Sequence, residues 1–137
     1  MSPTAIVTYH TRLSTSCVHV KSGQTISTDA PTDNHGQGQA FSPTDLTATS
    51  LASCMLTVMG IYAERQTISL EGSTAQVFKK MADHPRRIAS IIIEMTLPAS
   101  IPHPERPRLE FIARNCPVAK SLHPEIIQDI RFTYKEA

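Results

Sequence analysis

The chain contains 137 residues, of which 40% are hydrophobic and 18% are charged, and its formal net charge is +1 at pH 7. A chain of this length is expected to form one domain, residues 1–137, because domains most often contain about 100–150 residues. The near-neutral charge argues against a nucleic acid or a membrane surface as partner, since both require a basic patch.

The first 29 residues contain three short segments rich in β-branched side chains. These segments, 5–13, 17–21 and 24–29, are separated by breaks at 14–16 and at Ser22-Gly23, a pattern that predicts a short antiparallel meander. Cys17 lies on the second predicted strand, where we interpret it as a small buried hydrophobic residue.

Residues 30–41 form the most loop-like stretch, with a proline, an Asp-Asn pair, two glycines and no hydrophobic periodicity. The loop leads to the N-terminus of the following helix, where unpaired N–H groups favour anions. His35, Gln37 and Gln39 either line a pocket here or belong to a solvated connection.

A long helix is predicted from Ser42 to Arg65. Ser42 is a good N-cap, Pro43 suits the first helical position, and Asp45 completes a pattern close to a capping box. Apolar side chains occupy nearly the whole circumference, so we expect the helix to be buried in a protein core, with Cys54 at its middle. A single small domain with 5% aromatic residues has little else to cover such a helix, which favours a partner subunit.

After this helix the hydrophobic pattern changes to a period of two residues. Residues 67–81 and 87–97 therefore predict two strands that form a long hairpin around the turn ADHPR. The run from Ile91 to Ile93 is too apolar for a strand with a solvated face, so we expect burial on both faces.

The last segment contains two predicted helices and a strand. Residues 107–115 have helical spacing, and Cys116 precedes a proline, so it is expected to end this helix and to cap a short helix beginning at Pro117. A helix N-terminus stabilises a thiolate, which predicts a lowered pKa for the Cys116 thiol. A strand at about 127–134 closes the chain beside the hairpin, and the order of elements predicts an α+β fold.

The three cysteines carry the remaining functional information. Their odd number, together with the absence of an N-terminal signal pattern, predicts a reducing, cytoplasmic location. The sequence has no CxxC, HExxH or paired Cys/His spacing, and we expect neither a metal nor a cofactor. It also has no phosphate-binding glycine loop, GxSxG or Rossmann fingerprint, so any chemistry rests on the thiols.

Three motifs stand in order along the chain: SPTDLTATSLASCMLTV on the long helix, KKMADHPRRIASI across the hairpin tip and NCPVAKSLHPEI near the C-terminus. Together they resemble the OsmC/Ohr family of small thiol-dependent peroxidases. The resemblance extends from about residue 24 to the end. It implies an OsmC-like α+β fold in which antiparallel sheets wrap around a long buried central helix, within an intertwined homodimer.

The resemblance also implies hydroperoxide reduction. In the family a cysteine on the central helix attacks the peroxide and becomes a sulfenic acid, and the cysteine of the CPV motif condenses with it to a disulfide. Carried over, Cys54 is the peroxidatic thiol and Cys116 the resolving thiol, and both come from one chain. The implied substrate is an organic hydroperoxide, and the implied reductant is a dithiol such as a lipoylated protein.

Other family members activate the peroxidatic cysteine with an arginine held by the glutamate of an Asn-Pro-Glu motif. In this chain Thr44 occupies the place of the glutamate, Asp45 carries the carboxylate one position later, and Arg12 is the N-terminal arginine available. Three interpretations follow: a thiol peroxidase, two buried thiols without chemistry, and a non-catalytic protein that binds a small apolar or thiol ligand at the dimer interface.

Overall fold

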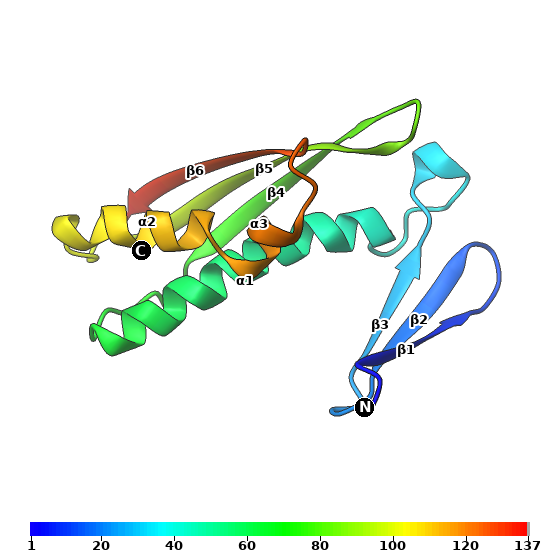
Figure 1. Ribbon diagram of the computed structural model, residues 1–137, viewed down its shortest axis with the longest axis horizontal. Helices are drawn as coiled ribbons and strands as arrows, with labels where there is room; N and C mark the ends of the chain where they lie inside the picture. The colour runs from blue at the N-terminus through cyan, green and yellow to red at the C-terminus, as the bar shows by residue number, and fades with distance from the viewer. Residues whose placement is uncertain (137) are drawn as a thin grey trace. The chain divides into compact units, whose positions relative to one another are not determined.

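The computed structural model describes residues 1–136. These residues form two compact units, Met1–Thr47 and a second unit that begins at Ala48, so the boundary falls near the start of the long helix. Each unit contains one three-stranded sheet (Figure 1). The architecture is α+β, as the order of the predicted elements indicates.

The first unit is built on an antiparallel meander. Strand β1 (Ala5–Tyr9) pairs with β2 (Ser14–His19), and β2 pairs with β3 (Thr25–Asp29), giving the sheet order β1-β2-β3. The turn between β2 and β3 contains Gly23 at φ +77°, which a glycine adopts without strain. The sequence therefore predicts this meander and its second turn correctly.

The first turn lies earlier than the sequence indicates. The predicted break at 14–16 is wrong, because these residues belong to β2 and the chain reverses at Thr11–Ser14. Arg12 and Leu13 occupy the centre of this turn with φ of 54° and 64°, as a type I′ turn requires. Positive φ costs residues other than glycine about 1–2 kcal/mol, so such turns usually contain glycine. Neither central residue of this turn is a glycine, and the sequence therefore does not indicate where the turn lies.

The loop before the long helix is held by its own hydrogen bonds. It contains a short 3₁₀ helix, η1 (Thr32–Asn34), and the N–H of Gly38 donates to the carbonyl of Ala30 over 3.1 Å. At its ends, the N–H of Asp29 donates to the carbonyl of Phe41, also over 3.1 Å. The loop is therefore an ordered part of the first unit.

The long helix α1 (Pro43–Arg65) begins at the predicted residue. Ser42 and Asp45 form a reciprocal capping box. The Ser42 N–H donates to the Asp45 carboxylate over 3.0 Å, and the Asp45 N–H donates to Ser42 Oγ over 3.1 Å. These two bonds satisfy N–H groups that the first turn of a helix otherwise leaves unpaired.

The second unit contains a sheet of order β4-β5-β6. Strands β4 (Thr74–Ala82) and β5 (Arg87–Pro98) form the predicted hairpin, although its first strand begins later than residue 67. Strand β6 (Ile127–Lys135) pairs with β5 in parallel, because the intervening segment is long enough for a crossover. The expectation of purely antiparallel sheets therefore holds for the first sheet only.

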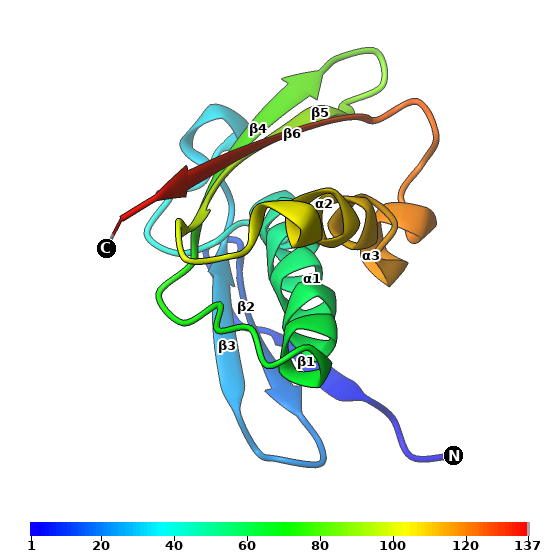
Figure 2. The ribbon, with the colours of Figure 1, turned by 90° about the vertical axis from the view of Figure 1, so that its left-hand side faces the viewer.

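The helices α1 and α2 (Arg106–Arg114) lie against the same face of this sheet (Figure 2). A third helix, α3 (Pro117–Ser121), follows α2, and a 3₁₀ turn, η2 (His103–Glu105), precedes it. Between the helices and the sheet lies an apolar core that includes Met55, Met59, Ile91, Ile93 and Leu109. Ile92 is only partly buried, so β5 alternates between a buried and a partly solvated face instead of being buried on both.

Within the single chain, burial of α1 is one-sided. One stripe is exposed, at helical spacing, and consists of Thr47, Ser50, Ser53, Thr57, Ile61 and Glu64. The expectation that a partner subunit completes the cover of this helix stays a prediction. By length and composition alone α1 could cross a membrane, but a core helix passes the same test, and its apolar residues contribute to the core described above.

Candidate functional site

Cys116 caps helix α3, as the sequence predicts. Its backbone is extended (φ −67°, ψ 159°), because Pro117 occupies the first helical position. The Ala119 N–H donates to Cys116 Sγ over 3.4 Å, so the sulfur takes the place of the usual capping oxygen. The side chain is 1% exposed and belongs to the core of the second unit.

Cys54 lies at the middle of α1 and meets Cys116. Cys54 packs against the same core but is only half-buried, because it borders the exposed stripe of the helix. The Cys54 thiol lies close enough to Cys116 to raise the pKa of the Cys116 thiol, although 62 positions separate the two residues in the sequence. Both cysteines are free thiols. The second unit thus places an accessible thiol beside a buried one.

The environment of Cys116 raises the pKa of its thiol. Burial is the largest cause, since the core disfavours the charged thiolate. The N–H groups of Ala119 and Val118 lower the pKa, and the neighbouring Cys54 thiol raises it. The predicted lowering is therefore wrong in its net direction: the helix N-terminus acts as expected, but burial outweighs it.

The other candidate residues belong to the first unit. The Asp45 carboxylate accepts the Ser42 N–H, so it is part of the helix cap, and Thr44 Oγ1 lies 3.3 Å from Ser42 Oγ. Arg12 lies in the turn between β1 and β2. Among the predicted site residues, the structure brings together Cys54 and Cys116 within one unit, and Thr44 and Asp45 at the helix cap.

Cys17 lies on β2, opposite Val7 and Ile26, and is half-buried. Its position within a strand ladder agrees with the interpretation as a small hydrophobic residue.

Sequence reasoning placed a helix N-terminus at Cys116, and the structure identifies the N–H groups concerned as those of Val118 and Ala119. Both act on the Cys116 sulfur. The proline directly after the cysteine is the signal that located them, because it fixes the start of the helix from which these N–H groups point backwards.

Comparison with known proteins finds similarity in both sequence and structure. A protein of Psychrobacter arcticus, named for osmotic stress induction and detoxification response, is 47% identical over 96% of each chain, with a TM-score of 0.93. The organic hydroperoxide resistance protein OsmC of Legionella pneumophila is 18% identical over 96% of this chain and 97% of its own, with a TM-score of 0.75. An OsmC-like protein of Mycoplasma pneumoniae is 15% identical over 95% and 94%, with a TM-score of 0.78.

The last two identities are low, so these two structures support the fold alone. No curated protein is detectably similar to the chain. The family model described as OsmC-like protein matches residues 36–130, which include the whole of α1, the hairpin of β4 and β5, and both cysteines of the thiol pair. The chain therefore belongs to the OsmC-like protein family.

Proposed function

We propose that the protein is a thiol-dependent peroxidase that reduces organic hydroperoxides. In the first step the Cys54 thiolate attacks the outer oxygen of ROOH, the O–O bond breaks, and the alkoxide takes a proton to leave as ROH. Cys54 is thereby oxidised to a sulfenic acid. In the second step the Cys116 sulfur attacks the sulfenic sulfur, the S–O bond breaks, and water leaves with the proton of the Cys116 thiol.

The contact between the two thiols is the observation that supports this proposal. A sulfenic acid formed beside a second thiol proceeds to a disulfide before further oxidation. Cys54 and Cys116 interact directly, so the second step requires no long movement of either residue.

The unequal burial of the two thiols favours the assignment of their roles. Cys54 is half-buried and borders the exposed stripe of α1, whereas Cys116 is 1% exposed. A peroxide can therefore reach the first sulfur more easily than the second. Burial also raises the pKa of Cys116, which keeps this residue protonated and less reactive toward peroxide until the sulfenic acid forms next to it.

The family resemblance supports our proposals for the substrate class, the reductant and the assembly. An organic hydroperoxide fits a thiol that packs against an apolar core, because burial of apolar surface favours the alkyl group. A dithiol, such as a lipoylated protein, would reopen the disulfide by exchange and become oxidised itself. We further propose that a second copy of the chain covers the exposed stripe of α1, and that the protein works in the reducing cytoplasm.

Three single-cysteine replacements test the mechanism. With cumene hydroperoxide as substrate and dihydrolipoamide as reductant, Cys54→Ser is expected to abolish peroxide consumption. Cys116→Ser should support a single turnover without disulfide formation. Cys17→Ser is the matched control and should retain full activity. Peroxide consumption by the Cys54→Ser variant equal to that of the unmodified chain would eliminate the proposal.

A thiol titration separates the peroxidase from a binding protein. After one equivalent of cumene hydroperoxide, two of the three thiols should disappear together, and a peptide map should join Cys54 to Cys116. A non-catalytic protein that holds a small apolar or thiol ligand would retain all three thiols.

The binding alternative is favoured by one observation, the use of the Asp45 carboxylate in the helix cap, since family peroxidases use a carboxylate to hold an activating arginine.

Arg12, Thr44 and Asp45 remain the candidates for supporting Cys54. The pH dependence of Cys54 alkylation in Arg12→Gln tests that role, because loss of an activating cation should move the profile to higher pH.

A further inference from the structure

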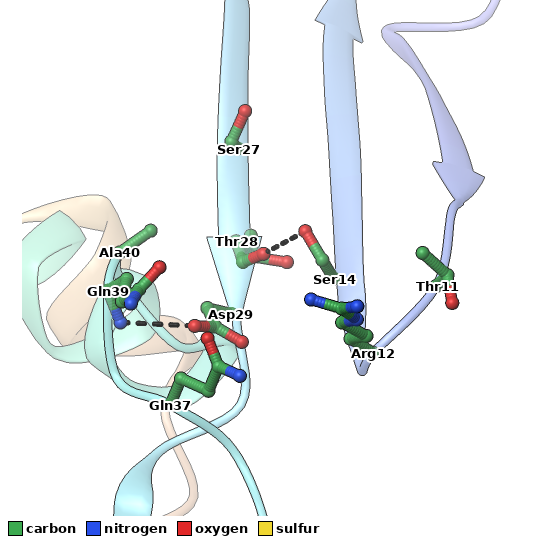
Figure 3. A pocket seen from close by; sticks show the side chains of 9 residues that line it. All are labelled: Thr11, Arg12, Ser14, Ser27, Thr28, Asp29, Gln37, Gln39 and Ala40. Carbon is green, nitrogen blue, oxygen red and sulfur yellow. Dashed lines mark hydrogen bonds between the residues drawn. The ribbon is translucent and has the colours of Figure 1, made fainter.

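The first unit contains a pocket of its own, which includes neither residue of the thiol pair. Its volume is about 320 Å³, and the turn after β1, the strands β2 and β3 and the loop before α1 supply its walls (Figure 3). The lining side chains are almost all polar: Thr11, Arg12, Ser14, Ser27, Thr28, Asp29, Gln37 and Gln39, with Ala40. This volume is at the lower end of the usual range for ligand pockets, which suits a small molecule.

Arg12 provides a positive charge on one side of the pocket. It occupies the first central position of the type I′ turn at φ 54°, and Leu13 follows at φ 64°. Backbone strain of this kind at residues other than glycine is concentrated at functional sites. Within residues 1–136 the guanidinium group makes no hydrogen bond and no ion pair, so its five N–H donors are available to a ligand.

Asp29 provides a negative charge on the other side. The residue is only 9% exposed, and one carboxylate oxygen accepts the Gln39 N–H over 3.1 Å. The other oxygen accepts no hydrogen bond from the described residues and points into the pocket toward the side of Arg12 (Figure 3). A carboxylate that is nine-tenths buried with one hydrogen bond is incompletely compensated for the loss of water.

The loop before α1 holds the wall of the pocket on the Asp29 side (Figure 3). Gly36 packs so closely on the preceding chain that an added Cβ would lie 1.7 Å from the Ala30 carbonyl oxygen. The Asp29 side chain is tied to the same loop through Gln39, and the Gln37 side chain lines the same pocket (Figure 3). The pocket is thus formed before a ligand arrives, which reduces the entropic cost of binding.

From these observations we infer that the pocket binds a small zwitterion of amino-acid size. Its carboxylate pairs with the Arg12 guanidinium, and its ammonium group donates to the free oxygen of Asp29 and to the amide oxygen of Gln37. Arg12 and Asp29 have opposite charges but form no ion pair with each other, so a ligand that carries both charges compensates both residues at once. This site lies within residues 11–40 and does not depend on the peroxidase proposal.

Calorimetric titration of the full chain tests the inference with three probes: L-serine, its methyl ester, which lacks the carboxylate, and N-acetyl-L-serine, which lacks the ammonium group. L-serine is expected to bind saturably with one site per chain. Each modified probe should bind at least about tenfold more weakly, because it loses one charge-assisted hydrogen bond.

Two variants assign the ends of the ligand. In Asp29→Asn, L-serine and N-acetyl-L-serine should bind equally weakly, and in Arg12→Gln, L-serine and its methyl ester should bind equally weakly. Gln37→Ala, whose side chain makes no hydrogen bond within residues 1–136, should weaken L-serine binding even if Asp29→Asn does not fold. Glu71→Gln, in an exposed turn of the second unit, is the charge-matched control and should leave binding unchanged.

The inference is overturned by any of three results: no saturable heat with L-serine, equal binding of all three probes, or unaltered L-serine binding in folded Gln37→Ala and Arg12→Gln. Circular dichroism of each variant establishes that it is folded before titration.

Discussion

The two units differ in what they bury. In the second unit the buried side chains are apolar and form one core, whereas the buried side chains of the first unit, among the described residues, are the polar Thr28, Asp29 and Ser42. The apolar residues of the first sheet, including Ile6, Val7 and Ile26, are largely exposed. The second unit is therefore held together by the hydrophobic effect, while the first depends on backbone ladders, a helix cap and polar contacts.

This difference matches the two chemical roles that we propose. In these proposals, the thiol pair that reacts with organic hydroperoxides lies against the apolar core of the second unit, whereas the pocket for a charged ligand lies in the polar first unit. The exposed apolar residues of the first sheet agree with the proposal that a second copy of the chain provides cover.

The largest expected loss of stability comes from creating a cavity in the core of the second unit. Ile93 on β5 is fully buried, so Ile93→Ala should lower the free energy of unfolding by about 2–5 kcal/mol. Urea unfolding measures this change. The matched variant in the first unit is Ile26→Ala on β3, where the side chain is 50% exposed and the loss should be below about 1 kcal/mol. Equal losses would contradict the contrast between the units.

A smaller effect is expected at Tyr134, whose hydroxyl donates to the Glu110 carboxylate over 2.7 Å and thereby links β6 to α2. Tyr134→Phe removes this bond but keeps the ring beneath the Arg106 guanidinium, so the free energy of unfolding should fall by about 1.5 kcal/mol. Thermal unfolding provides the measurement.

The control is Tyr62→Phe, which removes a similar bond to Glu105 at a more solvated place. Its effect should be clearly smaller than that of Tyr134→Phe, because water replaces the lost partner. A larger effect at Tyr62 would show that burial does not decide the strength of these bonds.

A variant of Ser42 tests how much a buried polar residue contributes to the stability of the first unit. Ser42→Ala removes the acceptor for the Asp45 N–H at the start of α1 and should cost about 1 kcal/mol in urea unfolding. Ser53→Ala, on the exposed stripe of the same helix, should change the free energy of unfolding little, since alanine is a good helix former. If both variants were equally stable, the capping box would contribute nothing measurable.

The last prediction concerns the pH dependence of Cys116 alkylation. Burial raises the pKa of Cys116, so iodoacetamide alkylation of Cys116 in Cys17→Ser/Cys54→Ser should require a higher pH than alkylation of a free cysteine peptide. The raised pKa stabilises the fold below the ordinary thiol pKa of about 8.5, and this contribution is lost as the pH rises through the folded-state value. If alkylation of Cys116 required the same pH as the peptide or a lower one, the helix N-terminus would lower the pKa of the thiol by more than burial raises it.

The sequence predicts most local features of the fold, because they depend on neighbouring residues. The start of α1 follows from Ser42, Pro43 and Asp45, and the cap of α3 follows from Cys116 and Pro117. The first turn was misplaced because Arg12 and Leu13 adopt positive φ without glycine or asparagine to indicate it. A strained turn of this kind is determined by the strands that it connects, which local propensity cannot show.

The candidate site was predictable to a different extent. The approach of Cys54 to Cys116 was expected from the family resemblance, since residue spacing alone cannot bring two positions 62 residues apart together. The net effect on the Cys116 pKa depends on burial, a property of the tertiary structure, so the local argument from the helix N-terminus gave the wrong direction. The pocket of Arg12 and Asp29 was only partly foreseen: Gln37 and Gln39 line it, and His35 does not.

The sulfur cap of α3 connects the redox state of the thiol pair to a backbone amide. Because the Ala119 N–H donates to Cys116 Sγ, any new bond to that sulfur changes the electronic environment of the Ala119 amide and hence its chemical shift. The ¹⁵N–¹H signal of Ala119 should therefore serve as an intrinsic reporter, one that distinguishes the dithiol from the disulfide in real time without a dye, a label or a change of sequence.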